Sequence, residues 1–84
     1  MPDLPVRVLL FSVLREGVGA GELHVSLPPG ATGLDLLDRL GAAHPEVARH
    51  RPVVRLAVNR RYAPLDTPLA ADDEVALITP VSGG

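Results

Sequence analysis

The last three residues, Ser82, Gly83 and Gly84, are the one feature of this 84-residue sequence that a fold by itself does not require. A terminal carboxylate, with a pKa of about 3.3 to 3.7, is a poor acyl donor until it is activated, for example as an adenylate. Because glycine has no Cβ, such an end can run extended through a narrow tunnel to a nucleophile in another protein's active site. The ending therefore predicts acyl-transfer chemistry at the C-terminus, with a frayed terminus as the alternative.

Apart from the C-terminus, the residues whose types could do chemistry are three histidines and an acidic run, which could bind a metal. His24, His44 and His50 do not have the spacing of a ligand set, so we expect them to be surface residues. The acidic run 72–74 precedes a predicted strand, which is more typical of a turn than of a cation site. The sequence thus predicts no metal site and no bound cofactor.

Composition narrows the class of protein. The chain is 46% hydrophobic and 21% charged with a net charge of -2, the profile neither of a disordered chain nor of a basic nucleic-acid binder. It has no cysteine, which excludes disulfides, zinc-thiolate sites and thiol nucleophiles. No apolar run reaches the roughly 18 residues of a membrane span, and the segment around Pro2, Asp3 and Pro5 lacks a signal-peptide pattern. We expect one cytoplasmic domain that binds neither nucleic acid nor membrane.

Hydrophobic patterning predicts the elements that must position the C-terminus. The nearly continuous apolar run 6–11 predicts a central strand, and strict alternation over 22–27 predicts its half-buried hairpin partner. Between them, Gly17, Gly19 and Gly21 do not match a phosphate-binding motif and predict a flexible loop.

One amphipathic helix is expected after the second strand. Thr32 is its predicted N-cap, Asp35 completes a variant of the capping box, and Pro45 ends the element. The polar segment 49–51 is predicted to be a loop. Apolar residues at helical spacing should face the sheet: Leu36, Leu37, Leu40 and Ala43.

The C-terminal half is predicted to supply two more strands. Residues 53–58 alternate as a third strand, 59–62 predict a turn, and 75–79 predict the last strand. This order predicts an α+β fold, a mixed sheet of four to five strands with one main helix packed on one face. Residues 1–79 would form this domain and 80–84 a flexible tail.

The sheet face without the helix is predicted to carry an apolar cluster. No second helix is predicted to cover it, so the cluster favours a partner protein, with a loop lying over the face as the alternative. Its outward strand positions are Arg7, Leu9, Phe11, Arg55, Ala57, Ala76 and Ile78.

The order of elements and the Gly-Gly end together resemble the ubiquitin-like β-grasp fold, among which sulfur carriers are the most similar. Over nearly the whole chain the sequence is similar to the small-subunit family of molybdopterin synthase, the MoaD-like sulfur carriers. Two positions depart from the family pattern, since 71–73 lacks the usual glycine and Thr79 stands where proline is common. The segments that carry the resemblance are 8–16, 27–40, 56–59 (Leu-Ala-Val-Asn) and 73–84, which begins Asp-Glu-Val-Ala and ends Pro-Val-Ser-Gly-Gly.

The resemblance implies that Gly84 is adenylated by a ubiquitin-activating-like adenylyltransferase that uses ATP, and is then converted to a thiocarboxylate with a sulfur donor enzyme. With Gly83 before it, the terminus would enter the large subunit of the synthase and donate sulfur to cyclic pyranopterin monophosphate in molybdenum cofactor biosynthesis. The resemblance also implies a hetero-oligomer whose small subunit is inert alone. Partner-binding residues expected from the cluster and the resemblance together are Leu9, Phe11, Ile78, Val81 and Ser82.

Three other functions are compatible with these features. The same carrier chemistry could serve thiazole synthesis for thiamine or the thiolation of tRNA. Gly84 could instead form isopeptide bonds in a protein modifier. The chain could also be a plain binding module whose Gly-Gly end is incidental.

Overall fold

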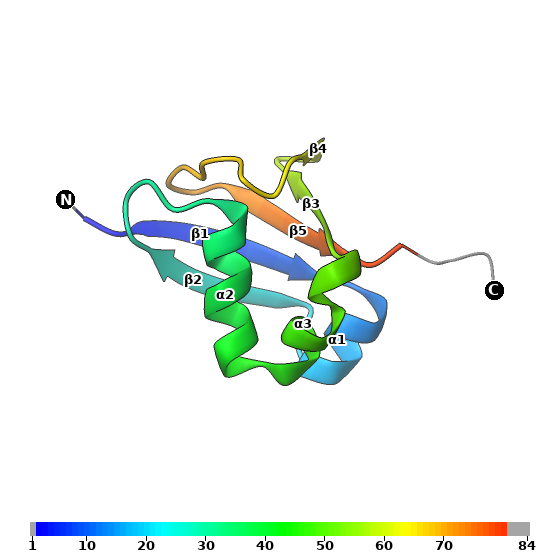
Figure 1. Ribbon diagram of the computed structural model, residues 1–84. Coiled ribbons are helices and arrows are strands. Elements are labelled where there is room, and N and C mark those ends of the chain that lie inside the picture. The colour runs from blue at the N-terminus through cyan, green and yellow to red at the C-terminus, as the bar shows by residue number, and fades with distance from the viewer. Residues whose placement is uncertain (1, 81–84) are drawn as a thin grey trace.

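This computed structural model describes residues 2–80, which form five strands, three α-helices and one 3-10 turn (Figure 1). The elements in order are β1 (Leu4–Leu10), α1 (Ser12–Val18), β2 (Glu22–Leu27), α2 (Gly33–Ala43), α3 (Pro45–His50), the 3-10 turn η1 (Arg51–Val53), β3 (Arg55–Val58), β4 (Arg61–Ala63) and β5 (Glu74–Ile78).

The strands form one mixed sheet in the order β2-β1-β5-β3-β4. The first and last strands, β1 and β5, lie side by side at its centre and run parallel. The β1–β2, β3–β4 and β3–β5 pairs are antiparallel. A parallel central pair needs a long crossover connection, and α2 lies within that connection. The predicted α+β fold of the β-grasp type, with a main helix on one face, is confirmed.

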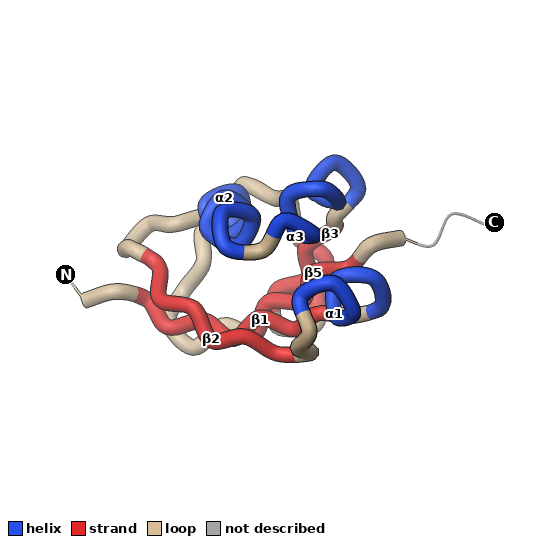
Figure 2. Tube along the Cα trace, turned by 90° about the horizontal axis from the view of Figure 1, so that it is seen from below, coloured by secondary structure: helices blue, strands red, loops and turns tan. Residues whose placement is uncertain are grey.

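The main helix, α2, begins with the capping box that the sequence predicts. Thr32 N donates to Asp35 Oδ2 at 2.8 Å, and Asp35 N donates to Thr32 Oγ1 at 3.4 Å. Leu36 and Leu40 are buried, whereas the predicted inward position Ala43 is exposed in the last turn. Figures 1 and 2 show α2 lying across one face of the sheet.

The core between α2 and the sheet consists of aliphatic side chains. The single Phe and the single Tyr of the chain are both exposed. Val8 and Leu10 of β1 and Val75 and Leu77 of β5 are each at most 1% exposed, as the alternation along these strands predicts. Burying one such side chain contributes about 1.5 to 3 kcal/mol, so packing supplies the stability of a chain without disulfides.

Two short helices occupy segments that the sequence predicted to be loops. α1 forms between β1 and β2 because Leu14 is completely buried in the core, and Gly19 ends it in the left-handed region at φ 86°. α3 and η1 replace the predicted loop at 49–51 because Val47 is also buried. α1 and α3 each hold one fully buried residue, and half-buried Val18 also packs against the core from α1, which is too few to establish a helical period in the sequence. Within residues 2–80, no helix is long and apolar enough to cross a membrane.

Several strand boundaries also differ from the prediction. β1 ends at Leu10, so Phe11 lies beyond the strand as the N-cap of α1. The turn predicted over 59–62 is shorter in the structure. It consists of Asn59 and Arg60, because β4 begins at Arg61. Both residues have positive φ, 51° and 71°, as a two-residue hairpin turn requires.

Candidate functional site

The sheet face opposite α2 carries a groove of about 440 Å³, which we call the open-face groove. The structure brings together here three residues that the sequence predicted to bind a partner, Leu9, Phe11 and Ile78. Arg7 and Arg55 do not line it. The full lining is Leu9, Phe11, Ala57, Arg60, Tyr62, Glu74, Ala76 and Ile78.

Strand register explains why this face is hollow. Ala76 of β5 lies opposite Leu9 of β1 on one side and opposite Ala57 of β3 on the other. Residues directly opposite each other in neighbouring strands point to the same face, so two small side chains meet at the centre of the sheet. Leu9 and Ile78 are larger and half-buried, and they form the sides of an apolar depression.

Two exposed aromatic rings flank the groove. Phe11 is 47% exposed, and its carbonyl oxygen accepts from Leu14 N at 3.1 Å, which fixes it at the junction of β1 and α1. Tyr62 of β4 is 72% exposed. Tyr62 was not predicted as a site residue because it lay in a predicted turn, and only the strand that follows Asn59 places it here. Exposed aromatic residues beside an apolar depression are typical anchors of protein interfaces.

A carboxylate between two arginines forms the charged side of the groove. Glu74 Oε1 lies 2.5 Å from Arg7 Nη2, and Glu74 Oε2 lies 3.7 Å from Arg60 Nε. The Glu74 side chain is only 19% exposed, whereas Arg60 is 89% exposed. This side of the groove therefore presents arginine to an approaching partner, while the carboxylate is already paired.

The C-terminal end of β5 lies at the Leu9 and Phe11 side of the open-face groove, away from Glu74 at the start of the strand. Ile78 ends β5, and Pro80 is the last described residue. The predicted site residues Val81, Ser82, Gly83 and Gly84 lie outside the described residues.

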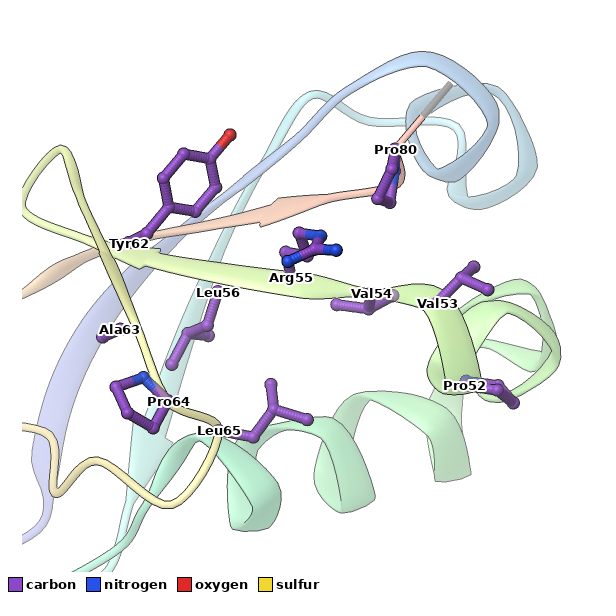
Figure 3. Close-up of a pocket in the computed structure, with 10 residues that line it drawn as sticks. All are labelled: Pro52, Val53, Val54, Arg55, Leu56, Tyr62, Ala63, Pro64, Leu65 and Pro80. Atoms are coloured by element: carbon purple, nitrogen blue, oxygen red, sulfur yellow. The ribbon is translucent and has the colours of Figure 1, made fainter. Parts of the chain in front are cut away.

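A second groove, of about 710 Å³, lies beside Pro80. Figure 3 shows Arg55 of β3 lying between that strand and the segment that carries Pro80. Tyr62 lines both this groove and the open-face groove, so the two depressions adjoin. Pro80 thus lies beside a groove that adjoins the open-face groove.

The three histidines differ in their exposure. His24 is exposed and pairs with Glu22 at 2.9 Å, as expected of a surface residue, whereas His44 and His50 are half-buried. The Nδ1 atom of His50 lies 2.9 Å from Glu46 O. Among residues 2–80 there is no cluster of three His, Asp or Glu side chains that could hold an ion.

Comparisons with known proteins match nearly the full length of the chain. The model of the ThiS family matches residues 8–84, a span that includes Gly83 and Gly84. The molybdopterin synthase sulfur carrier subunit of Arabidopsis thaliana is 37% identical over 82 residues, covering 98% of this chain and 85% of that protein. Its counterpart in Mycobacterium tuberculosis is 37% identical over 82 residues, covering 96% of this chain and 99% of that protein. Small archaeal modifier protein 1 of Haloferax volcanii is 38% identical over 86 residues, covering 89% of this chain and 95% of that protein.

Solved structures have the same fold. The crystal structure of SAMP1 from Haloferax volcanii superposes with a TM-score of 0.81 and 33% identity, covering 95% of this chain and 99% of that one. One chain of the complex of subunits 1 and 2 of the molybdopterin-converting factor from Helicobacter pylori superposes with a TM-score of 0.65 and 23% identity, covering 96% and 100%. At that identity the second likeness shows the fold alone.

Proposed function

The chain belongs to the ThiS family, and on that premise we propose that it is the sulfur carrier subunit of a molybdopterin synthase. The observation that carries the proposal is its 37% identity, over nearly the whole length of both chains, with relatives of that name. The Gly-Gly end supports it, because this is the part of the chain whose chemistry a carrier needs. We also propose that the protein acts in the cytoplasm.

The proposed chemistry takes place at Gly84. In the activating enzyme the terminal carboxylate attacks the α-phosphate of ATP, which forms the acyl adenylate and releases pyrophosphate. A persulfide of the sulfur donor enzyme then displaces AMP, and reduction of the resulting acyl disulfide by a thiol leaves the thiocarboxylate. In the synthase the thiocarboxylate sulfur bonds to cyclic pyranopterin monophosphate in place of an oxygen substituent, which leaves as water or phosphate. Hydrolysis of the acyl–sulfur bond then restores the Gly84 carboxylate, and two such transfers supply the two sulfurs of the dithiolene.

The open-face groove is the proposed docking surface for the large subunit and for the activating enzyme. Its residues Leu9, Phe11 and Ile78 adjoin the strand end from which the C-terminal segment continues. A partner that covers this face therefore receives the terminus at the border of the same interface. The complex of the two subunits from Helicobacter pylori, one chain of which shares this fold, supports a hetero-oligomer of small and large subunits.

A protein modifier is the second candidate function. It is favoured by one observation, the 38% identity with small archaeal modifier protein 1. The two candidates share the activation of Gly84 and differ in the acceptor, which is a sulfur-accepting pterin in the first and an amine of another protein in the second.

Intact-mass spectrometry tests the carrier proposal directly. The chain is incubated with the activating enzyme, ATP and a sulfur source, and we expect the mass increase of one oxygen-to-sulfur replacement. A chain that lacks Gly84 is the matched control and should keep its mass. No change in mass with an activating enzyme proven competent on another carrier would overturn the proposal.

A second assay separates the two acceptors. The thiocarboxylate form is mixed with the large synthase subunit and the pterin precursor, and dithiolene formation is followed together with the return of the carboxylate mass. Conjugates with other proteins, formed without any sulfur transfer to the pterin, would favour the modifier.

A further inference from the structure

The outer edge of β2 carries backbone groups that face away from the sheet. β2 is an edge strand, and Leu10 N donates to Gly21 O at 2.9 Å across the β1–β2 ladder. Because hydrogen-bonded pairs alternate along an antiparallel ladder, the odd-numbered residues of β2 direct their N–H and C=O groups toward β1. The even-numbered residues Glu22, His24 and Ser26 therefore direct theirs outward, where a further strand could pair with them.

A small apolar groove runs beside this edge. It has a volume of about 260 Å³ and lies between β2 and the second half of α2. Leu23 and Val25 of β2 line one side, and Leu40 and Ala43 of α2 line the other. Figure 1 shows α2 continuing past β2 at the open edge of the sheet. The volume is below the roughly 300 to 1,000 Å³ of small-molecule sites, and the groove follows a strand, so it suits the side chains of an extended segment.

The charge at this groove is basic. Arg39 and His44 line it, and no carboxylate does. Arg39 is exposed and makes no ion pair with the rest of the described chain. The carboxylates of the same helix are otherwise engaged, Asp35 in the capping box and Asp38 in an ion pair outside the groove. An acidic group beside an apolar segment would therefore find an available partner.

We propose that β2 and α2 form a second docking site, for an extended peptide with alternating apolar residues and a flanking carboxylate. The peptide would add to the sheet at β2 and exchange backbone hydrogen bonds with Glu22, His24 and Ser26. Its residues opposite Leu23 and Val25 would place their side chains in the groove, since paired residues share a face.

The site is separate from the proposed sulfur chemistry. β2 and β4 are opposite edges of the sheet, and the grooves beside Pro80 and Phe11 lie on other elements. A bound peptide would thus leave the C-terminus free to enter a partner, and the site could recruit the carrier to a second protein during transfer.

The probe is a synthetic peptide of alternating valine and threonine with aspartates at both ends, so that either strand direction brings a carboxylate to Arg39. It is titrated into the full chain, and backbone amide NMR is recorded. We expect the shift changes to fall on β2 and on the second half of α2, with slowed hydrogen exchange at the His24 and Ser26 amides. Shift changes confined to β4 or to the open-face groove would overturn the proposal, as would no binding.

Charge variants test the acidic preference. Arg39→Glu should weaken peptide binding about threefold or more, since the substitution replaces attraction between exposed charges by repulsion. Arg61→Glu on β4 is the matched control and should leave the affinity unchanged. If both variants bind the peptide with equal affinity, the proposed acidic partner is wrong. It is also wrong if a peptide with lysine ends binds the native chain as tightly as the peptide with aspartate ends.

Two further variants and a sedimentation measurement test the pairing at the β2 edge. Ser26→Pro removes an outward N–H without breaking a ladder bond, so it should weaken binding while the circular dichroism spectrum stays native. Removal of Gly84 should not change the affinity, because the site does not depend on carrier chemistry. Sedimentation that shows two copies paired through β2, with the peptide excluded, would replace the proposed peptide by a second copy of the chain.

Discussion

The side-chain amide of Asn59 donates to Asp73 Oδ1 at 2.9 Å and so joins the β3–β4 turn to the residue before β5. The Oδ1 atom of Asn59 also accepts from Glu74 N at 3.0 Å. Asp73 Oδ2 in turn accepts from Ala70 N at 2.8 Å, which closes the preceding loop. Two segments that carry the family resemblance, 56–59 and 73–76, therefore meet at one point. Their contact fixes the turn that carries Arg60 and the strand that carries Glu74, both of which line the open-face groove.

We expect Asn59→Gly to lower the free energy of unfolding by about 1 to 2 kcal/mol. Glycine tolerates φ 51° at this position, so the loss comes mainly from the two side-chain hydrogen bonds, each worth about 0.5 to 1.5 kcal/mol, with a smaller part from the entropy that glycine adds to the unfolded chain. Asn59→Ala should cost more, because alanine is strained at positive φ. Urea unfolding followed by circular dichroism measures both variants, and a glycine variant as stable as the native chain would contradict the role given to the side chain.

Asp72 has a backbone conformation that glycine adopts more readily. Its φ is 68°, and it lies in the segment where the sequence departs from the family pattern by lacking a glycine. We expect Asp72→Gly to raise the stability by up to about 1 kcal/mol, since relief of the left-handed strain exceeds the entropy that glycine adds to the unfolded chain. Asp66→Gly, at an exposed residue without positive φ, is the control and should be neutral or destabilising. Thermal unfolding of the two variants and the native chain shows whether each substitution raises or lowers the stability.

Gly33 lies where the first turn of α2 meets the loop before β5. A Cβ at this position would lie 2.6 Å from Leu65 O and 2.7 Å from Leu56 Cδ2. Replacing glycine by alanine in a helix normally raises the free energy of unfolding by about 1 kcal/mol. At Gly33 the overpacking should outweigh this gain, so that Gly33→Ala lowers the free energy of unfolding by about 1 to 3 kcal/mol. Gly41→Ala in the same helix meets Ala48 Cβ only at 3.3 Å and should have a clearly smaller effect. The measurement is the denaturant midpoint of each variant. If the two midpoints coincide, the loop moves aside freely and the predicted overpacking at Gly33 is wrong.

Local patterns were predictable from the sequence because the interacting residues are close along the chain. The capping box joins Thr32 to Asp35 within one turn, and strand alternation places Leu9 and Ile78 on the face opposite α2. The open apolar face could therefore be predicted before its shape was known.

Features that depend on register or on a single anchor could not be predicted in the same way. The hollow at Ala57 and Ala76 exists because β3 and β5 pair with these two residues opposite each other. α1 is only seven residues long and contacts the core through Leu14 and half-buried Val18, and β4 is only three residues long, so neither is long enough for a clear periodic pattern. Tyr62, which lines two grooves, was missed for that reason.

The last prediction concerns the open-face groove as a docking surface. We expect Phe11→Asp to weaken binding to the large synthase subunit about tenfold or more, because an exposed aromatic anchor would be replaced by a charge that the interface must desolvate. Leu34→Asp is the matched control, since Leu34 is 38% exposed on α2, away from the groove. Isothermal titration of both variants against the large subunit gives the affinities. If the Leu34 variant is weakened as much as the Phe11 variant while both stay folded, the partner does not bind through the open face, and the interface must lie on the helical side of the sheet.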